Sequence, residues 1–144
     1  MNCAGGSRKQ PAAAQAFILK TAVPSPQQPD AEALCQQGLD LLARGDPARA
    51  ATAFRAAMDA DPENFEAHHG LIRSLRDAGK LEQSIGAALA LTALTPGDPL
   101  AHTALSISLQ AAGHVPQAEA AAAQARIVEW KVQLQSPPGE ESLK

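Results

Sequence analysis

Apolar residues recur at helical spacing through the middle of the chain, and short polar breaks divide them into segments. The first two segments carry their apolar residues at Leu34, Leu41 and Leu42, and then at Ala50, Phe54, Ala57 and Met58. Spacings of three and four residues place such side chains on one face of an α-helix. The break at positions 45–47 reads Gly-Asp-Pro, and Asp61-Pro62 closes the second segment. This pattern predicts two helices joined by a tight turn.

The same pattern returns with a spacing of 34 residues. Gly45, Gly79 and Gly113 stand in equivalent places, and Pro62 is matched by Pro96. A fixed period of this length indicates a repeat array in which each unit is one helical pair. We therefore expect three helix-turn-helix units at residues 31–64, 65–98 and 99–135. A flexible leader (1–30) would precede them, and a disordered tail (136–144) would follow.

Signals at the helix ends agree with this division. Gly45 can end the first helix, and Asp46 and Pro47 suit the cap and first turn of the next. Asn64 and Asp98 are placed to cap the first helices of the second and third units. Abundant Ala and an aromatic content of 3% favour packed helices over sheet. The predicted fold class is all-α.

The first unit closely resembles the tetratricopeptide repeat, whose pattern is large-x-x-Leu-Gly-x-x-Tyr followed by Ala, Phe, Ala and a closing Pro. The matching residues are Leu34, Gly38, Leu41, Ala50, Phe54, Ala57 and Pro62, whereas Gln37 departs from the pattern. The second and third units keep the same register. The resemblance covers residues 31 to about 130 and implies an α–α superhelix, that is, a tetratricopeptide solenoid.

Two departures from the family pattern stand out. In the second unit, Ile72 and Ala88 replace the usual Gly and bulky aromatic residue, so the small and large partners are exchanged. In the third unit, Trp130 stands in place of the closing proline. With no proline before Pro137, we expect the last helix to run on to about Gln135.

This last helix has a polar face and an apolar face. The polar face, which would cap the array, consists of Arg126, Glu129, Lys131, Gln133 and Gln135. Ile127, Trp130 and Leu134 lie on the other face, and two interpretations are open. They pack back on the preceding helices as a built-in cap, which we favour, or they form an apolar patch through which two copies associate as a homodimer.

The leader contains two features of interest. Residues 16–23 (AFILKTAV) are apolar and would pack on the first helix of the array; the alternative is that they occupy its binding groove until a partner displaces them. Cys3 begins a Cys-Ala-Gly-Gly-Ser stretch that resembles the acylated start of a bacterial lipoprotein. Acylation needs an apolar segment upstream, and only two residues precede Cys3. We expect an ordinary thiol, with an envelope lipoprotein that assists assembly as the alternative.

Composition argues against several functions. A net charge of −3 without a basic stripe disfavours nucleic-acid binding. No apolar run approaches the roughly 20 residues needed to cross a bilayer, and no signal peptide is evident. Two cysteines make no disulfide framework, so a cytoplasmic location is expected.

Catalytic and metal-binding motifs are also lacking. The chain has no phosphate-binding glycine loop, Gly-x-Ser-x-Gly elbow or His-Glu-x-x-His. His68 and His102 occupy one repeat position, normally filled by an aromatic residue, so we expect them to pack rather than to bind a metal. We predict no enzyme activity and no cofactor.

In tetratricopeptide arrays, the first helices of the units line a groove that binds a peptide or helix of another protein. The resemblance places the groove positions at Glu32, Cys35, Leu39 and Leu42, at Glu66, His69, Arg73 and Arg76, and at Leu100, Thr103, Ile107 and Gln110. His69, Arg73 and Arg76 form one helical stripe. This stripe either binds a carboxylate of the partner through charge-assisted hydrogen bonds, or is a solvated face paired with acids such as Asp77.

One subclass of the family can be set aside. Its chaperone-binding members hold a C-terminal carboxylate with Lys, Asn and Arg side chains. The corresponding positions here are Cys35, Leu39, Gly70, Leu100 and Ala104, and none of these residues is Lys, Asn or Arg. The function predicted from the sequence is a non-catalytic adaptor that binds another protein in its groove, with self-association through the last helix as the alternative.

Overall fold

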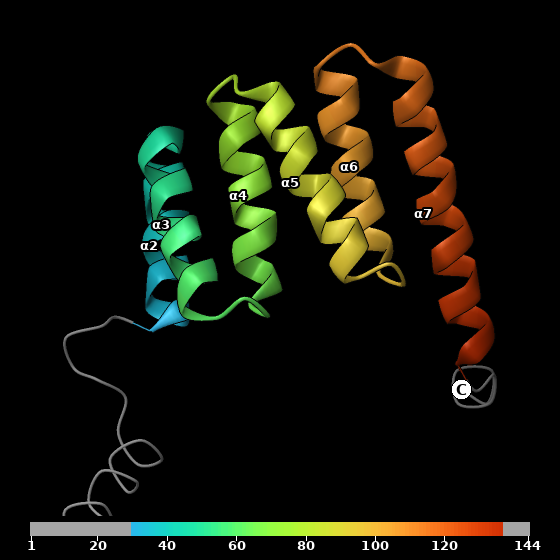
Figure 1. The fold of residues 1–144 in the computed structure, drawn as a ribbon, viewed down its shortest axis with the longest axis horizontal. Helices are drawn as coiled ribbons and strands as arrows, with labels where there is room; N and C mark the ends of the chain where they lie inside the picture. The colour runs from blue at the N-terminus through green and yellow to red at the C-terminus, as the bar shows by residue number, and fades with distance from the viewer. Residues whose placement is uncertain (1–29, 137–144) are drawn as a thin grey trace, which may run out of the picture. The chain divides into compact units, whose positions relative to one another are not determined.

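The chain forms six α-helices in a computed structural model that describes residues 30–136, so Cys3 and residues 16–23 lie outside the described part. The helices are α2 (Ala31–Ala43), α3 (Pro47–Ala60), α4 (Phe65–Asp77), α5 (Leu81–Leu94), α6 (Pro99–Ala111) and α7 (Val115–Gln135) (Figure 1). The described residues contain no strand, which confirms the all-α prediction. Helices α2, α4 and α6 begin at the residues where the three units were predicted to begin.

The turns within the three helical pairs share one geometry. Gly45, Gly79 and Gly113 have φ angles of 80°, 79° and 86°, in the left-handed region that glycine adopts without strain. The residue after each glycine donates its backbone N–H to a carbonyl oxygen in the preceding helix, at 2.9 Å in all three turns. These bonds satisfy carbonyl groups that a helix end would otherwise leave unpaired.

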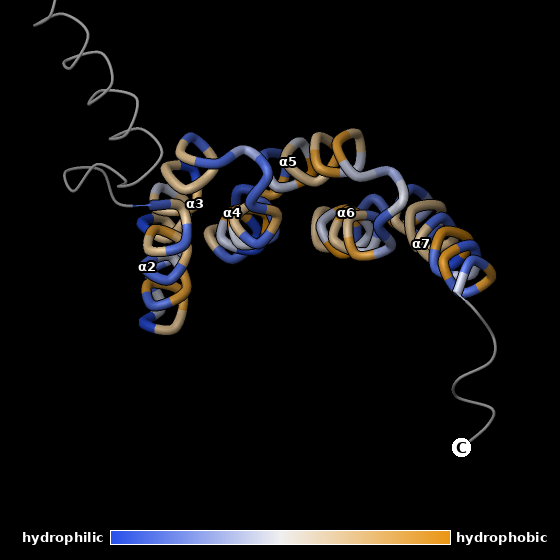
Figure 2. Tube along the Cα trace, turned by 90° about the horizontal axis from the view of Figure 1, so that it is seen from below, coloured by the Kyte–Doolittle hydropathy of each residue, from blue (hydrophilic) through white to orange (hydrophobic). Residues whose placement is uncertain are grey.

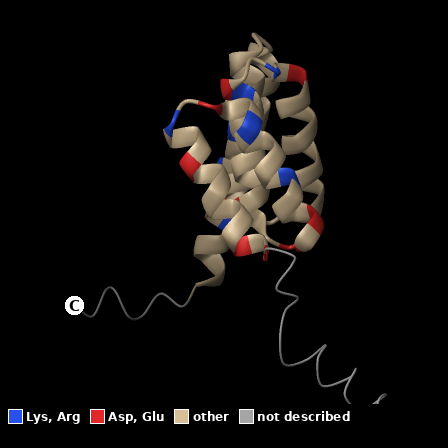
Figure 3. Cartoon of the chain, turned by 90° about the vertical axis from the view of Figure 1, so that its left-hand side faces the viewer, with Lys and Arg blue, Asp and Glu red and all other residues tan. Residues whose placement is uncertain are grey.

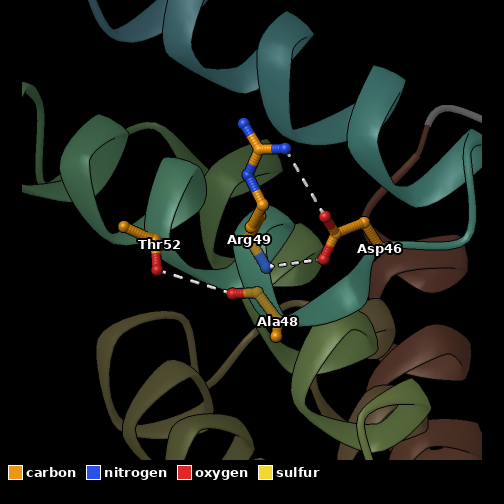
Figure 4. Close-up of polar contacts among 4 residues, drawn as sticks. All are labelled: Asp46, Ala48, Arg49 and Thr52. Carbon is orange, nitrogen blue, oxygen red and sulfur yellow. Dashed lines mark hydrogen bonds and ion pairs between the residues drawn. The ribbon is translucent and has the colours of Figure 1, made fainter.

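Side chains cap the helices that follow the breaks. The Asp46 carboxylate accepts a hydrogen bond from the backbone N–H of Arg49 at 3.2 Å and forms an ion pair with its guanidinium at 3.7 Å (Figure 4). Asn64 and Asp98 accept backbone hydrogen bonds at the starts of α4 and α6 in the same way. The caps predicted at these three residues are confirmed.

The helices form two layers. In the first layer α2, α4 and α6 lie side by side, and each contacts the next (Figure 2). In the second layer, the backbones of α3, α5 and α7 lie farther apart, although the Arg55 guanidinium of α3 donates a hydrogen bond to the side-chain oxygen of Gln83 in α5 at 3.4 Å. Because the helices of the first layer are the more closely spaced, α2, α4 and α6 form the inner surface of the repeat stack.

Phe54 is the centre of the first part of the core and is fully buried. Its ring lies between Gly38 of α2 and Gly70 of α4, where an added Cβ would stand 2.7 Å and 2.3 Å from ring carbons. Gly38 is the glycine of the repeat pattern, and its missing side chain leaves room for the ring. Gly70 has the same role outside that pattern.

The second part of the core exchanges large and small residues, as expected. Ile72 and Ala88 are both buried in one cluster with residues of α5, α6 and α7. The Ser84 hydroxyl donates to the Ile72 carbonyl oxygen at 3.0 Å, and in the next repeat the Ser106 hydroxyl donates to the Ala118 carbonyl oxygen at 2.8 Å. Positions 72 and 106 are equivalent, as are positions 84 and 118. A serine therefore links the two helices of the pair at the same place in both repeats, but the second helix donates in the second repeat and the first helix donates in the third.

Helix α7 ends at Gln135, as predicted, and has 21 residues against 14 in α3 and α5. Its buried residues are Ala118, Ala121, Ala125 and Val128. Ile127, Trp130 and Leu134 are 44%, 61% and 67% exposed. The prediction that they pack back as a cap is wrong. Ile127 and Trp130 each follow a buried residue by two positions, which turns them about 200° away from the buried face.

The polar face of α7 is exposed to solvent at the end of the array, which is where the sequence predicted a polar surface. Glu119 and Arg126 are exposed at positions where α5 has Ile85, which is buried, and Thr92, which is half-buried. Helix α6 covers α5, but no helix follows α7 in the described residues. In this described part, no helix is long and apolar enough to cross a membrane.

Candidate functional site: a groove beside helix α6

A hollow of about 250 Å³ lies between α4 and α6. It is lined by His69, Ile72, Arg73, Arg76, Leu100, Thr103, Ala104 and Ile107. No residue of α5 lines it, so it opens on the inner layer, away from α5. Six of the residues predicted to face the groove therefore meet at one place. Ile72 and Ala104 complete the lining and were not predicted to do so.

A second hollow, of about 290 Å³, lies on the other side of α6, against α7. It is lined by Pro99, Leu100, Thr103, Ser106, Ile107, Ala122, Ala125, Arg126 and Glu129. Ser106 and Ala122 stand where the first repeat has Gly38 and Phe54. Because neither residue of the third pair is large, the space between α6 and α7 stays open. Two small residues at these paired positions were the sequence signal for this hollow.

The two hollows share Leu100, Thr103 and Ile107, which form a ridge along α6. Leu100 is 64% exposed and Ile107 is 46% exposed. The Thr103 hydroxyl donates to the Pro99 carbonyl oxygen at 3.0 Å, so its hydrogen is already engaged within the helix. The result is an apolar ridge with a concavity on each side.

The two arginines of the first hollow differ in their surroundings. Arg73 lies 3.6 Å from the Asp77 carboxylate, and both side chains are exposed. Arg76 is half-buried and forms no ion pair with any residue in the range 30–136. Each of the two interpretations of the basic stripe therefore fits one arginine. Arg73 is paired with Asp77, as on a solvated face, whereas Arg76 has no ion-pair partner among the described residues and is available for a carboxylate of a partner.

His69 adds a polar group to the same hollow. Burial lowers the pKa of its imidazole; the Asp98 carboxylate opposes this shift, and His68 adds to it. Since the ordinary value is 6.5, His69 is uncharged near neutral pH. The positive charge of the hollow thus comes from its guanidinium groups.

The groove positions predicted in the first repeat do not join this site. Cys35 is 3% exposed, so the prediction that it faces a partner is wrong. Burial raises the pKa of its thiol, and the Glu66 and Glu32 carboxylates raise it further, against a hydrogen bond with Asn64. Leu39 and Leu42 pack on the core of the first repeat. Neither hollow is lined by these residues, or by the exposed Glu32, Glu66 and Gln110.

The histidines at the shared repeat position have structural contacts. His68 is buried, and its Nε2 lies 2.8 Å from the Pro62 carbonyl oxygen; in the next repeat, His102 Nε2 lies 3.0 Å from the Pro96 carbonyl oxygen. Each ring thus ties its helix to the proline that closes the preceding unit. Within residues 30–136, no group of three or more His, Cys, Asp or Glu could hold a metal ion.

Charged residues are mixed rather than gathered into one basic face in the view of Figure 3. Acidic residues lie among the Lys and Arg residues on the helices seen there. Arg126 and Glu129, which both line the second hollow, are one example of such mixing.

Comparison with known proteins supports the repeat assignment. Residues 35–99 match the family model described as tetratricopeptide repeat. A solved structure titled "MamA MSR-1 C2" is similar with a TM-score of 0.63 and 19% identity, over 71% of this chain and 59% of that chain. Another, titled "CopN-Scc3 complex", has a TM-score of 0.62 and 21% identity, over 89% of this chain and 80% of that one. At these identities the likeness concerns the fold. No curated protein matches the sequence.

Proposed function

We propose that this chain, which belongs to the tetratricopeptide repeat family, is a non-catalytic adaptor that binds a segment of another protein in the groove beside α6. Repeats of this family are protein-interaction scaffolds. A rigid surface of packed helices can take up a partner segment with little backbone movement.

The observation that carries the proposal is the exposure of Leu100 and Ile107 between two concavities. Both side chains stand on one ridge, at 64% and 46% exposure. Large apolar residues left exposed at a concave surface mark an interaction site. The hollows, of about 250 and 290 Å³, fall below the roughly 300–1,000 Å³ of small-molecule sites. They suit single side chains of a protein segment better than a cofactor.

Differential capture from a lysate of the native host tests this function. Leu100→Asp should abolish retention of proteins that the wild-type chain captures, because a carboxylate on the ridge would be desolvated on binding. Leu94→Asp is the matched control, since Leu94 is 58% exposed but lies on α5 in the other layer. Equal capture by both variants and the wild type would place the interaction elsewhere.

A second candidate is self-association through the end of α7, which the exposure of Trp130 and Leu134 favours. Figure 2 shows hydrophobic positions continuing to the end of this helix. Trp130 is the sole tryptophan of the chain, and tyrosine is absent, so intrinsic fluorescence reports on this site alone. A dimer should show a concentration-dependent blue shift and a sedimentation coefficient that Trp130→Ala reduces. A monomer in both proteins would contradict this candidate.

A further inference from the structure

We infer that the groove binds an amphipathic helix that crosses α6, pairs an acidic residue with Arg76, and places apolar side chains in the two hollows. This inference rests on the proposed function, because it specifies the chemistry of the segment that the groove would bind.

The acidic residue follows from the charges that line the groove. Arg76 is half-buried in a hollow that it shares with apolar residues such as Ile72 and Ala104 as well as with polar ones. No carboxylate among residues 30–136 forms an ion pair with it. A partly desolvated guanidinium gains most from a carboxylate, which accepts two parallel hydrogen bonds. Arg73 is a weaker candidate because Asp77 already lies 3.6 Å away.

The position of the acidic residue follows from the difference between the hollows. In the second hollow, the charges of Arg126 and Glu129 cancel, so it offers no net attraction for an anion. The uncompensated charge is confined to the α4 side. The partner therefore carries its acidic residue at the end that enters the first hollow and is apolar where it reaches α7.

The helical conformation follows from the scarcity of hydrogen-bond partners in the groove. An extended segment needs donors and acceptors for its own backbone. Thr103 donates to Pro99, and Arg73 is engaged with Asp77. Ser106 donates to Ala118, and Arg76 is assigned to the acidic residue of the partner. The polar lining residues that remain are His69, Arg126 and Glu129, and the other lining positions, including Ala104, are apolar. A helix satisfies its own backbone and presents one apolar face, which is what this surface can accept.

The spacing of the apolar residues follows from the packing of α4, α6 and α7. The hollows lie on opposite sides of α6, and neighbouring helices are generally about 8–10 Å apart. Residues at i and i+7 of a helix lie on one face about 10.5 Å apart. We therefore expect two apolar residues seven positions apart, with an Asp or Glu within one turn of the first.

Selection from a library of random 16-residue peptides displayed on yeast tests the inference with the full chain as bait. Peptides that bind the wild type and are lost on Leu100→Asp are the groove-specific set. They should share the acidic residue and the seven-residue apolar spacing. Arg76→Glu should weaken their binding at least about tenfold and should select Lys or Arg in place of the acid. Arg55→Glu makes the same charge change on α3 and should leave the affinities unchanged.

The outcomes separate the inference from the function on which it rests. Leu100-dependent peptides without an acidic preference, or with affinities that Arg76→Glu leaves unchanged, would overturn the inference while the groove function stands. The same holds if a central proline, which breaks a helix, leaves their binding intact. If no selected peptide depends on Leu100, both the groove function and the inference fail.

Discussion

The ring of Phe54 lies directly on Gly70, so close that a Cβ on Gly70 would stand 2.3 Å from the ring carbon Cε1. Phe54 belongs to α3 and Gly70 to α4, and the contact therefore joins the first repeat to the second. The ring cannot withdraw, because a Cβ at Gly38 on α2 would stand only 2.7 Å from its Cζ. One aromatic side chain thus fixes the separation of three helices.

Gly70→Ala should destabilise the fold by about 1–3 kcal/mol, since overpacking a buried contact forces the ring or the helix to move. This loss exceeds the gain of about 1 kcal/mol that alanine brings to a helix interior. Urea unfolding followed by circular dichroism measures the difference. Gly86→Ala is the control: Gly86 lies in α5, and apart from its chain neighbours and its own helix backbone no atom lies within 4 Å of its added Cβ. It should stabilise the protein by about 0.5–1 kcal/mol. Equal shifts in both variants would contradict the role of the Phe54 contact.

The fold was predictable because its period, turns and caps are local. Gly45 and Asp46 specify a turn by their own conformational preferences, and repetition confirms the frame. The role of Gly70 was not predictable in this way. It stands two residues before the position equivalent to Gly38 and becomes a contact only when α4 packs on Phe54. The prediction that Trp130 packs on the preceding helices failed for a related reason. Periodicity shows on which face of the helix Trp130 lies, but not whether another helix covers that face.

Ser84 and Ser108 form a fully buried hydroxyl pair, with their oxygen atoms 2.7 Å apart, between α5 and α6. Ser84→Ala should cost about 1–3 kcal/mol, because it leaves the Ser108 hydroxyl buried without this partner. Replacing both serines with Ala should cost less than the sum of the single changes, and a double-mutant cycle in urea measures this coupling. Thr52→Ala, at an exposed hydroxyl on α3, should stay within about 0.5 kcal/mol. Strictly additive effects of the two serines would contradict the pairing.

Much of the candidate site was also predictable, but only where the family pattern places residues on the inner layer. Arg73 and Arg76 occur on one stripe in the sequence, and their different states depend on Asp77 and on burial by α6. The second hollow arises from what is missing, since neither Ser106 nor Ala122 fills the space that Phe54 fills in the first repeat. Comparison with the repeat pattern identifies residues that match it, and it does not show where missing side-chain volume leaves a hollow.

Cys35 should react slowly with alkylating reagents in the native protein. Its side chain is buried, and burial together with Glu66 and Glu32 raises the pKa of the thiol, so little nucleophilic thiolate is present. In a Cys3→Ser background, N-ethylmaleimide should modify native Cys35 on the order of 100-fold more slowly than in urea. Comparable rates would show that the first repeat opens readily.

The same thiol should affect stability in alkaline solution. The ordinary pKa is 9.0 and the folded value is higher, so the unfolded chain loses its proton first as the pH rises. The free energy of unfolding should therefore decline above about pH 9, and Cys35→Ala should remove that part of the decline. Urea titrations at pH 8 and pH 10 in the Cys3→Ser background measure it. An unchanged slope in the alanine variant would contradict the assignment.

His69 should titrate at a pH below 6.5, because burial lowers the pKa of its imidazole more than Asp98 raises it. As the pH falls through 6.5, the unfolded chain binds the proton first, so stability is complete above this value and declines below it. His69→Gln should reduce the loss of stability between pH 7.5 and pH 5.5. The midpoint of the His69 ring resonances in an NMR titration gives the direct measurement. A midpoint at or above 6.5 would contradict the lowered pKa of His69. A midpoint above 7 would mean that a charged imidazole lines the hollow together with Arg76 at neutral pH, and the hollow would then owe its positive charge to both groups.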